Sequence, residues 1–175
     1  MKLFHILTSK NILLSLLLSI FLSNFKFIDA ANGEFLNYNP DRDAQSIHEL
    51  FKEHAKFLFE SGEYNPKAVN YMLKTMKTKV LYENNELKGF IIYLIEKLGN
   101  FCYIAEIAIK TDEQRKGYGS NMVQHILNYF KEQKCDRITT NINKNNKAMI
   151  SLVKKFDFKE EDEKNDLITF SIDLK

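Results

Sequence analysis

The 175-residue chain contains no tryptophan, two cysteines, two prolines and six glycines. Two cysteines are too few for a mini-protein held together by disulfides. So few glycines and prolines exclude a collagenous or low-complexity chain. The four histidines include no pair at i, i+4, so a zinc-binding helix is absent and no metal is expected. A net charge of +2 without a basic block argues against nucleic acid as a partner.

Aromatic and aliphatic residues, in contrast, are plentiful. Hydrophobic residues make up 45% of the chain, with 14 phenylalanines and 8 tyrosines among them. This supply of core material excludes a disordered chain. The length suits one domain, or one domain preceded by a leader.

The N-terminus has the features of a leader. Lys2 and Lys10 form a positively charged start, and residues 12–22 are an apolar run broken only by two serines. Small residues at Ala30 and Ala31 then provide a cleavage site, as in a secretory signal peptide. A membrane-spanning helix needs about 20 apolar residues, and this run is much shorter.

We therefore expect residues 1–30 to be a cleaved signal peptide, with an uncleaved membrane anchor as the alternative. Either version carries residues 32–175 across the membrane, because the positively charged end stays inside. The domain is then exported, or anchored to a membrane through the leader alone.

The rest of the chain alternates between strand and helix patterns. Period-two runs and turn residues predict strands at 35–38, 79–82, 88–96, 101–109, 137–142, 158–161 and 167–174. Apolar residues at helical spacing predict helices at 40–60, 66–76, 119–134 and 146–156. Asn39-Pro40 and Asn65-Pro66 each supply an N-cap followed by proline at the first helical position. This order predicts an α/β domain with a mixed sheet.

The most informative segment is the loop at residues 114–120, between a predicted strand and a predicted helix. Gly117 and Gly119 allow close approach of the backbone, and free N–H groups at a helix start bind anions. Arg115 and Lys116 add positive charge. The natural ligand is a phosphate or pyrophosphate, although a plain turn into a helix would look the same. The Walker and dinucleotide-binding glycine patterns are both absent.

Three motifs resemble those of one family. Gln114-x-x-Gly117-x-Gly119 is similar to the acyl-CoA pyrophosphate loop of the GNAT superfamily of N-acetyltransferases. Residues 146–158 resemble that family's C-terminal helix, and residues 87–90 resemble the start of its third strand. The resemblance covers roughly residues 34–174 in element order and spacing.

The resemblance implies a mixed, mostly antiparallel sheet flanked by helices, in which two parallel strands splay apart at the cofactor site. It also implies an N-acetyltransferase domain at 32–175 that transfers an acetyl group from acetyl-CoA to a primary amine of a small molecule or protein. The cofactor-binding residues that follow from it are Ile107, Ala108, Ile109, Gln114, Arg115, Lys116, Gly117, Tyr118, Gly119, Ser120 and Asn146.

Glu106 is the candidate general base, because some family members place a glutamate near this point of the same strand. Tyr103 is a second position compatible with the family, and Asn141 on the next strand is a candidate substrate contact. A solvated strand residue, or a partner of Arg115, is the structural alternative for Glu106. A positioned base accelerates proton transfer by about 10²–10⁴-fold.

Two positions depart from the family pattern. Val153 occupies the place where many members carry the tyrosine that protonates the leaving thiolate; Ser151 or water is the substitute. Asp157 replaces a glycine before Phe158, which an aspartate tolerates because it can adopt the left-handed conformation. The missing tyrosine and the leader leave two alternatives: an exported CoA-binding or degenerate domain that acts as an interaction module, and a membrane-anchored scaffold.

The resemblance also places Cys102 and Cys135 at touching ends of neighbouring parallel strands, within the range of a disulfide. An exported domain meets oxidising conditions. We nevertheless expect two buried free thiols, with the disulfide as the alternative.

Overall fold

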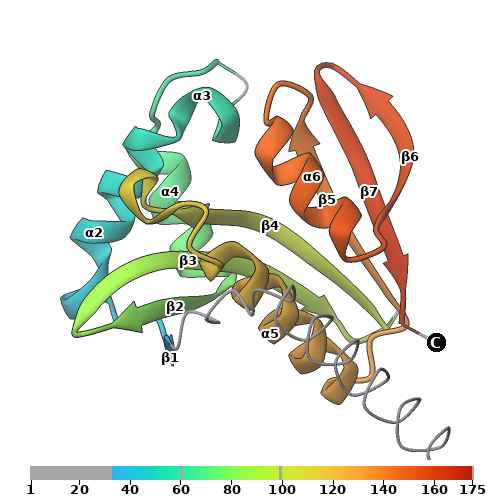
Figure 1. The fold of residues 1–175 in the computed structure, drawn as a ribbon, viewed down its shortest axis with the longest axis horizontal. Coiled ribbons are helices and arrows are strands. Elements are labelled where there is room, and N and C mark those ends of the chain that lie inside the picture. The colour runs from blue at the N-terminus through green and yellow to red at the C-terminus, as the bar shows by residue number, and fades with distance from the viewer. Residues whose placement is uncertain (1–32, 60, 99, 175) are drawn as a thin grey trace, which may run out of the picture.

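Residues 33–59, 61–98 and 100–174 are described by the structure, a computed structural model of the chain. Seven strands form one sheet (Figure 1). The strands are β1 (Glu34–Asn37), β2 (Lys77–Glu83), β3 (Glu86–Glu96), β4 (Phe101–Ile109), β5 (Arg137–Asn143), β6 (Lys159–Lys164) and β7 (Leu167–Asp173). The helices are α2 (Pro40–Glu53), α3 (Ala55–Leu58), α4 (Pro66–Thr75), α5 (Tyr118–Glu132) and α6 (Lys147–Lys155), with a 3-10 turn, η1, at Thr111–Glu113.

The order of strands in the sheet is β1-β2-β3-β4-β5-β7-β6. Every neighbouring pair is antiparallel except β4 and β5, which run parallel. The parallel pairing extends only from Phe101–Arg137 to Ile104–Thr140, so both strands continue beyond the last paired residues without pairing to each other. The predicted fold class, including the splayed parallel pair, is confirmed.

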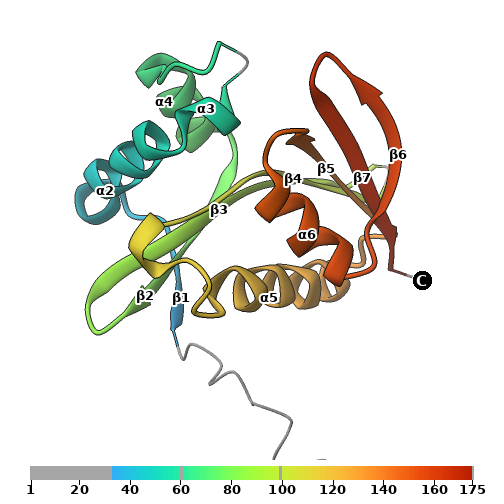
Figure 2. The same cartoon turned by 45° about the horizontal axis from the view of Figure 1, so that its top comes forward.

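Helices cover both faces of the sheet (Figure 2). On one face, α5 and α6 pack on a core that includes Ile91, Ile104 and Phe170. On the other face, α2 and α4 pack on a second core around Phe51 and Phe90, whose rings stack 5.0 Å apart. The sheet therefore lies between two helical layers, each with its own core.

Most of the predicted local features are present in the structure. Asn39 and Asn65 cap α2 and α4 by accepting hydrogen bonds from backbone N–H groups of the first turn. Asn84 and Asn85 form the hairpin turn with φ angles of 54° and 61°. Asp157 adopts the left-handed conformation, with φ of 64°, after α6.

The prediction of one continuous helix from Pro40 was wrong, because the helix breaks at His54 between α2 and α3. The His54 imidazole donates a hydrogen bond from Nε2 to the carbonyl of Ile109, at 2.9 Å. Beside it, the N–H of Thr111 donates to Oε1 of Glu53, at 2.7 Å. These contacts join the helix break to the end of β4.

The expectation of two free thiols was also wrong. Cys102 and Cys135 form a disulfide, with their Cα atoms 6.0 Å apart, and both residues are buried. The cause is the register of the parallel pair, which sets Cys102 opposite Ile138, three residues beyond Cys135. The bridge therefore joins β4 to the segment that enters β5.

The predicted leader lies outside the described residues. Among the helices that the structure does describe, none has the length and apolar character needed to cross a bilayer.

Candidate active site

Beyond Ile104 and Thr140 the two parallel strands diverge, and a cleft of about 610 Å³ opens there. A β-bulge in β4 at Ala105 shifts the pairing with β3 at this point and re-aims the following side chains. The cleft is lined by His54, Phe57, Leu58, Ile107, Ala108, Ile109, Gln114, Arg115, Gly117, Gly119, Ser120, Asn145, Asn146, Lys147, Ala148, Met149, Ser151, Leu152 and Lys155.

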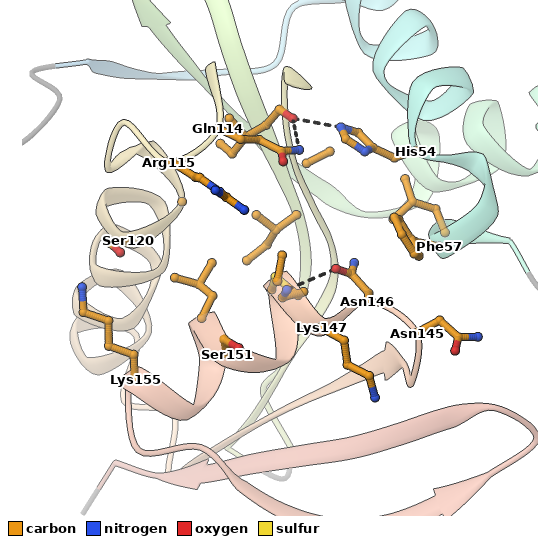
Figure 3. A pocket seen from close by; sticks show the side chains of 18 of the residues that line it. His54, Phe57, Gln114, Arg115, Ser120, Asn145, Asn146, Lys147, Ser151 and Lys155 are labelled. Atoms are coloured by element: carbon orange, nitrogen blue, oxygen red, sulfur yellow. Dashed lines mark hydrogen bonds between the residues drawn. The ribbon is translucent and has the colours of Figure 1, made fainter. Parts of the chain in front are cut away.

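The open edge of β4 presents backbone groups to the cleft. The carbonyl of Ile109 faces this side, since it accepts hydrogen bonds from His54 and from Nε2 of Gln114, at 3.4 Å (Figure 3). The carbonyl of Ala108 points the other way, toward Gly89 of β3. Because neighbouring residues of a strand alternate, the N–H and carbonyl of Ile107 also face the cleft. A ligand in the cleft can pair with them as a further strand would.

The glycine loop begins α5. Arg115 and Gly117 both have positive φ angles, 64° and 95°, and Gly117 is the N-cap of the helix without a side-chain cap. The first N–H groups of α5 therefore lack a capping side chain and point toward the cleft end of the helix, where the helix dipole is positive. This arrangement fits an anion such as pyrophosphate.

Ion pairs behind the loop hold it in place. The ammonium of Lys88 contacts Glu113 at 2.7 Å, and Lys116 contacts the other oxygen of Glu113 at the same distance. Hydrogen bonds from Lys116 and Lys88 lower the pKa of Glu113 to about 2. The Tyr118 hydroxyl donates to Glu83, and this bond raises the pKa of Tyr118 to about 12.

Two of the predicted cofactor residues consequently do not line the cleft. Lys116 is committed to Glu113, and Tyr118 is buried with its hydroxyl on Glu83. Their backbone N–H groups, at the start of α5, are what they can offer a ligand. The other nine predicted residues, from Ile107 through Ser120 and Asn146, line the cleft.

Three cations around the cleft have no carboxylate partner among the described residues: Arg115, Lys147 and Lys155. Other basic side chains of the domain, such as Arg137 and Lys144, are paired with acids. A cleft rimmed by unpaired cations attracts a ligand with several negative charges.

Glu106 lies beside the cleft and is not among the residues that line it. It lines a small adjoining cavity together with Phe57, Asn141 and Asn146. Burial raises the pKa of the Glu106 carboxyl to about 8. Burial and the charge of Glu106 also raise the pKa of the Tyr103 hydroxyl, which is within hydrogen-bonding reach of Asn141. The structure thus brings the predicted catalytic residues together at one point.

The last helix contributes Asn146 and Ser151. The side chain of Asn146 caps α6 by accepting from the N–H of Met149, at 3.1 Å, and Ser151 faces the cleft (Figure 3). Val153 is only 1% exposed and packs in the core beneath α6, so it does not reach the cleft. Among the described residues no group of His, Cys, Asp and Glu side chains could hold a metal ion.

A family model for the Acetyltransferase (GNAT) family matches residues 44–158, well over half of the chain. The chain belongs to the GNAT acetyltransferase family. Membership of this family implies acyltransferase activity. By sequence alone, no curated protein matches the chain.

Solved structures with this fold include several acetyltransferases. A Bacillus subtilis acetyltransferase in complex with CoA is 17% identical, has a TM-score of 0.68, and covers 82% of this chain and 100% of its own length. The ribosomal-protein-S18-alanine N-acetyltransferase of Escherichia coli is 15% identical, with a TM-score of 0.68 and coverages of 81% and 94%. The spermidine N-acetyltransferase of Vibrio cholerae, in complex with CoA and spermine, is 16% identical, with a TM-score of 0.67 and coverages of 80% and 94%. At these identities the likeness establishes the fold.

One wall of the site, formed by His54, Phe57 and Leu58, was not predicted from the sequence. The three residues follow the same helical spacing as the buried face of α2, so nothing local distinguishes them from core residues. Lys147 and Lys155 were not predicted either, because the sequence does not reveal which basic residues stay unpaired.

Proposed function

We propose that the protein is an N-acetyltransferase that transfers the acetyl group of acetyl-CoA to a primary amine. The observation that carries this proposal is the continuity of the site. The half-buried carboxyl of Glu106 lies in a small cavity beside a cleft whose walls are an unpaired strand edge and an anion-binding helix start.

The cleft fits the parts of acetyl-CoA in order. The N–H groups at the start of α5, with Arg115 beside them, suit the pyrophosphate. The open edge at Ile107 suits the amide groups of the pantetheine arm, which pair with it as a strand would. The thioester then lies near Glu106, where β4 and β5 separate.

Glu106 accepts a proton from the attacking amine, directly or through one water. The nitrogen bonds to the thioester carbonyl carbon, the C–S bond breaks, and the products are an amide and the CoA thiolate. A carboxyl with a pKa of about 8 is a better base for an ammonium ion than an ordinary glutamate, since its proton affinity is closer to that of the amine. The N–H of Ile107 faces the developing oxyanion; one such donor is worth about 2.7–4 kcal/mol of barrier.

The departure of the CoA thiolate does not require a tyrosine in this domain. Val153 is in the core, whereas the Ser151 hydroxyl lies in the cleft. A thiol has a pKa of about 8.5, so its thiolate leaves at neutral pH with water or Ser151 as the proton source. The absence of the family tyrosine slows this step without blocking it.

The acceptor is a primary amine of a small molecule or of a protein. One structural relative acetylates a ribosomal protein alanine and another a polyamine, by their names. A panel that contains a peptide α-amine, a lysine peptide, spermidine and a simple alkylamine covers these chemistries.

The test is amine-dependent release of free thiol from acetyl-CoA, with the acetylated product identified by mass spectrometry. We expect thiol release that depends on one class of amine in the panel. Acetyl-CoA binding by calorimetry without thiol release for any amine would favour the interaction-module alternative. Absence of both would reject the CoA site itself.

We further propose that residues 1–30 are removed as a signal peptide and that residues 32–175 work outside the cytosol. The disulfide between Cys102 and Cys135 supports this, because such bonds persist in oxidising compartments. Intact mass of the protein from its native host should show a chain that begins near Ala31. A chain that begins at Met1 and is recovered from the cytosol would contradict this proposal.

A further inference from the structure

The cleft has two distinct ends (Figure 3). At one end Phe57 and Asn146 lie beside the opening between β4 and β5. At the other end Ser120 of α5 and Lys155 of α6 line the seam between these two helices. Lys155 lies nine positions after Asn146, which is roughly 14 Å along the axis of α6. The seam therefore lies well away from the position of the thioester.

One cation, Lys155, lies at this seam. It is exposed, its side chain lines the cleft, and no carboxylate among the described residues pairs with it. Its neighbour Lys154 points to the other side of the helix, where it contacts Glu160 at 3.2 Å and lies over the ring of Phe170. Consecutive residues of a helix differ in direction by about 100°, so the side chains of the two lysines lie on different faces of α6.

The position of Lys155 in its helix matters for an anion. Lys155 is the last residue of α6, where the unpaired carbonyls give the helix end a negative partial charge. A phosphate is therefore unfavourable at this end of α6 unless a cation offsets the negative partial charge of the helix end. An anion held at the seam would depend on the ammonium of Lys155.

CoA carries a third phosphate besides its pyrophosphate, on the 3′ carbon of the ribose at the adenosine end. With the thioester at the opening between β4 and β5 and the pyrophosphate at the start of α5, the adenosine end continues toward the seam. We infer that Lys155 binds the 3′-phosphate and makes the site prefer CoA to 3′-dephospho-CoA. This inference rests on the proposed function and assigns a specificity-determining residue to it.

The experiment measures the Kd of CoA and of 3′-dephospho-CoA by calorimetry for the full chain and for three variants. The unsubstituted protein should bind CoA about 10-fold more tightly than 3′-dephospho-CoA. Lys155→Met should weaken the binding of CoA by that factor and leave the affinity for 3′-dephospho-CoA unchanged. Lys155→Arg should keep the preference for CoA. Lys154→Met is the matched control and should behave as the unsubstituted protein does.

Each other result overturns the inference in a recognisable way. An equal loss of affinity for both ligands in Lys155→Met would show that the lysine contacts the pyrophosphate, which both ligands carry. Equal affinity of the unsubstituted protein for the two ligands would remove the preference, and an equal effect of Lys154→Met would remove the assignment to Lys155. If neither ligand binds the unsubstituted protein, the proposed function fails together with the inference.

Discussion

The two ends of the β4–β5 pair have opposite characters. At one end, Phe101 to Ile104 pair with Arg137 to Thr140, and the disulfide between Cys102 and Cys135 joins the same region. At the other end the same strands separate and leave the edge at Ile107 and Ile109 without a strand partner. We refer to these as the closed end and the open end.

The difference lies in how the backbone groups are satisfied. At the closed end the backbone N–H and carbonyl groups of the two strands bond to one another, so this end contributes to the stability of the fold. At the open end the N–H and carbonyl groups of Ile107 need another partner, because buried backbone polar groups are costly when unpaired. A pantetheine arm supplies that partner. The binding site is thus an interrupted sheet, and its position depends on where the closed end stops.

The first way to test the comparison is to weaken the closed end. Replacing Cys102 and Cys135 by alanine removes a bridge across 33 residues, which should lower the free energy of unfolding by about 3–4 kcal/mol in the chain-entropy account. Denaturant unfolding measures the loss. Below the unfolding transition the acetyl-CoA affinity should stay within about 3-fold, since the cleft residues are untouched. A loss of affinity in a folded variant would show that the closed end also shapes the open end.

The second test acts on the chemistry of the open end. Glu106→Gln should lower kcat/KM by about 10²-fold while acetyl-CoA binding stays nearly unchanged, because the substitution removes a charge and little volume. In the unsubstituted protein kcat/KM should rise with pH through about 8, as the carboxyl loses its proton. The loss caused by the substitution should shrink at high pH, where free amine forms without help. Glu132→Gln, at the exposed end of α5, is the matched control.

The same substitution has a consequence for stability whose sign follows from the pKa. Glu106 has a folded-state pKa of about 8, above its ordinary value of 4.5, so the folded protein holds a proton that the unfolded chain has lost. Stability therefore falls as pH rises from about 4.5 to 8. Glu106→Gln should reduce this fall and raise the Tm at pH 8. If Tm depends on pH in the same way in the variant and in the unsubstituted protein, and the pH–rate profile is also the same, Glu106 has no part in the mechanism.

The third test places a larger side chain in the glycine loop, beside the open end. A Cβ on Gly119 would lie 3.2 Å from Cδ2 of Leu152, so a valine there presses on the seam between α5 and α6 and on the anion site. Gly119→Val should weaken acetyl-CoA binding about 10-fold or more in calorimetry, with the far-UV spectrum retained. Gln124→Val places the same side chain on the exposed side of α5 and should leave binding unchanged. Unchanged affinity in a folded Gly119→Val protein would show that the loop is not the pyrophosphate site.

Features with a local cause could be predicted from the sequence. The asparagine caps, the Asn84–Asn85 turn and the glycine loop depend on residues a few positions apart, and each was found where it was expected. The splayed strands followed from the family resemblance, which the glycine loop and the segments 87–90 and 146–158 carried.

Features that depend on distant partners could not be predicted in this way. The break at His54 depends on the carbonyl of Ile109, and Lys116 turns from the cleft because Glu113 is fixed by Lys88. Val153 looked like a missing catalytic group, yet it belongs to the core. In each case the deciding contact comes from a part of the chain that sequence spacing does not bring together.

Hydrogen exchange with and without acetyl-CoA tests the central claim most directly, since it reports on both ends of the β4–β5 pair in one experiment. Acetyl-CoA should slow exchange at residues 107–109 and 115–120 and leave 101–104 and 137–140, which already pair with each other, unchanged. No added protection at 107–109 and 115–120, or protection confined to the closed end, would contradict the assignment of the open end as the acetyl-CoA site.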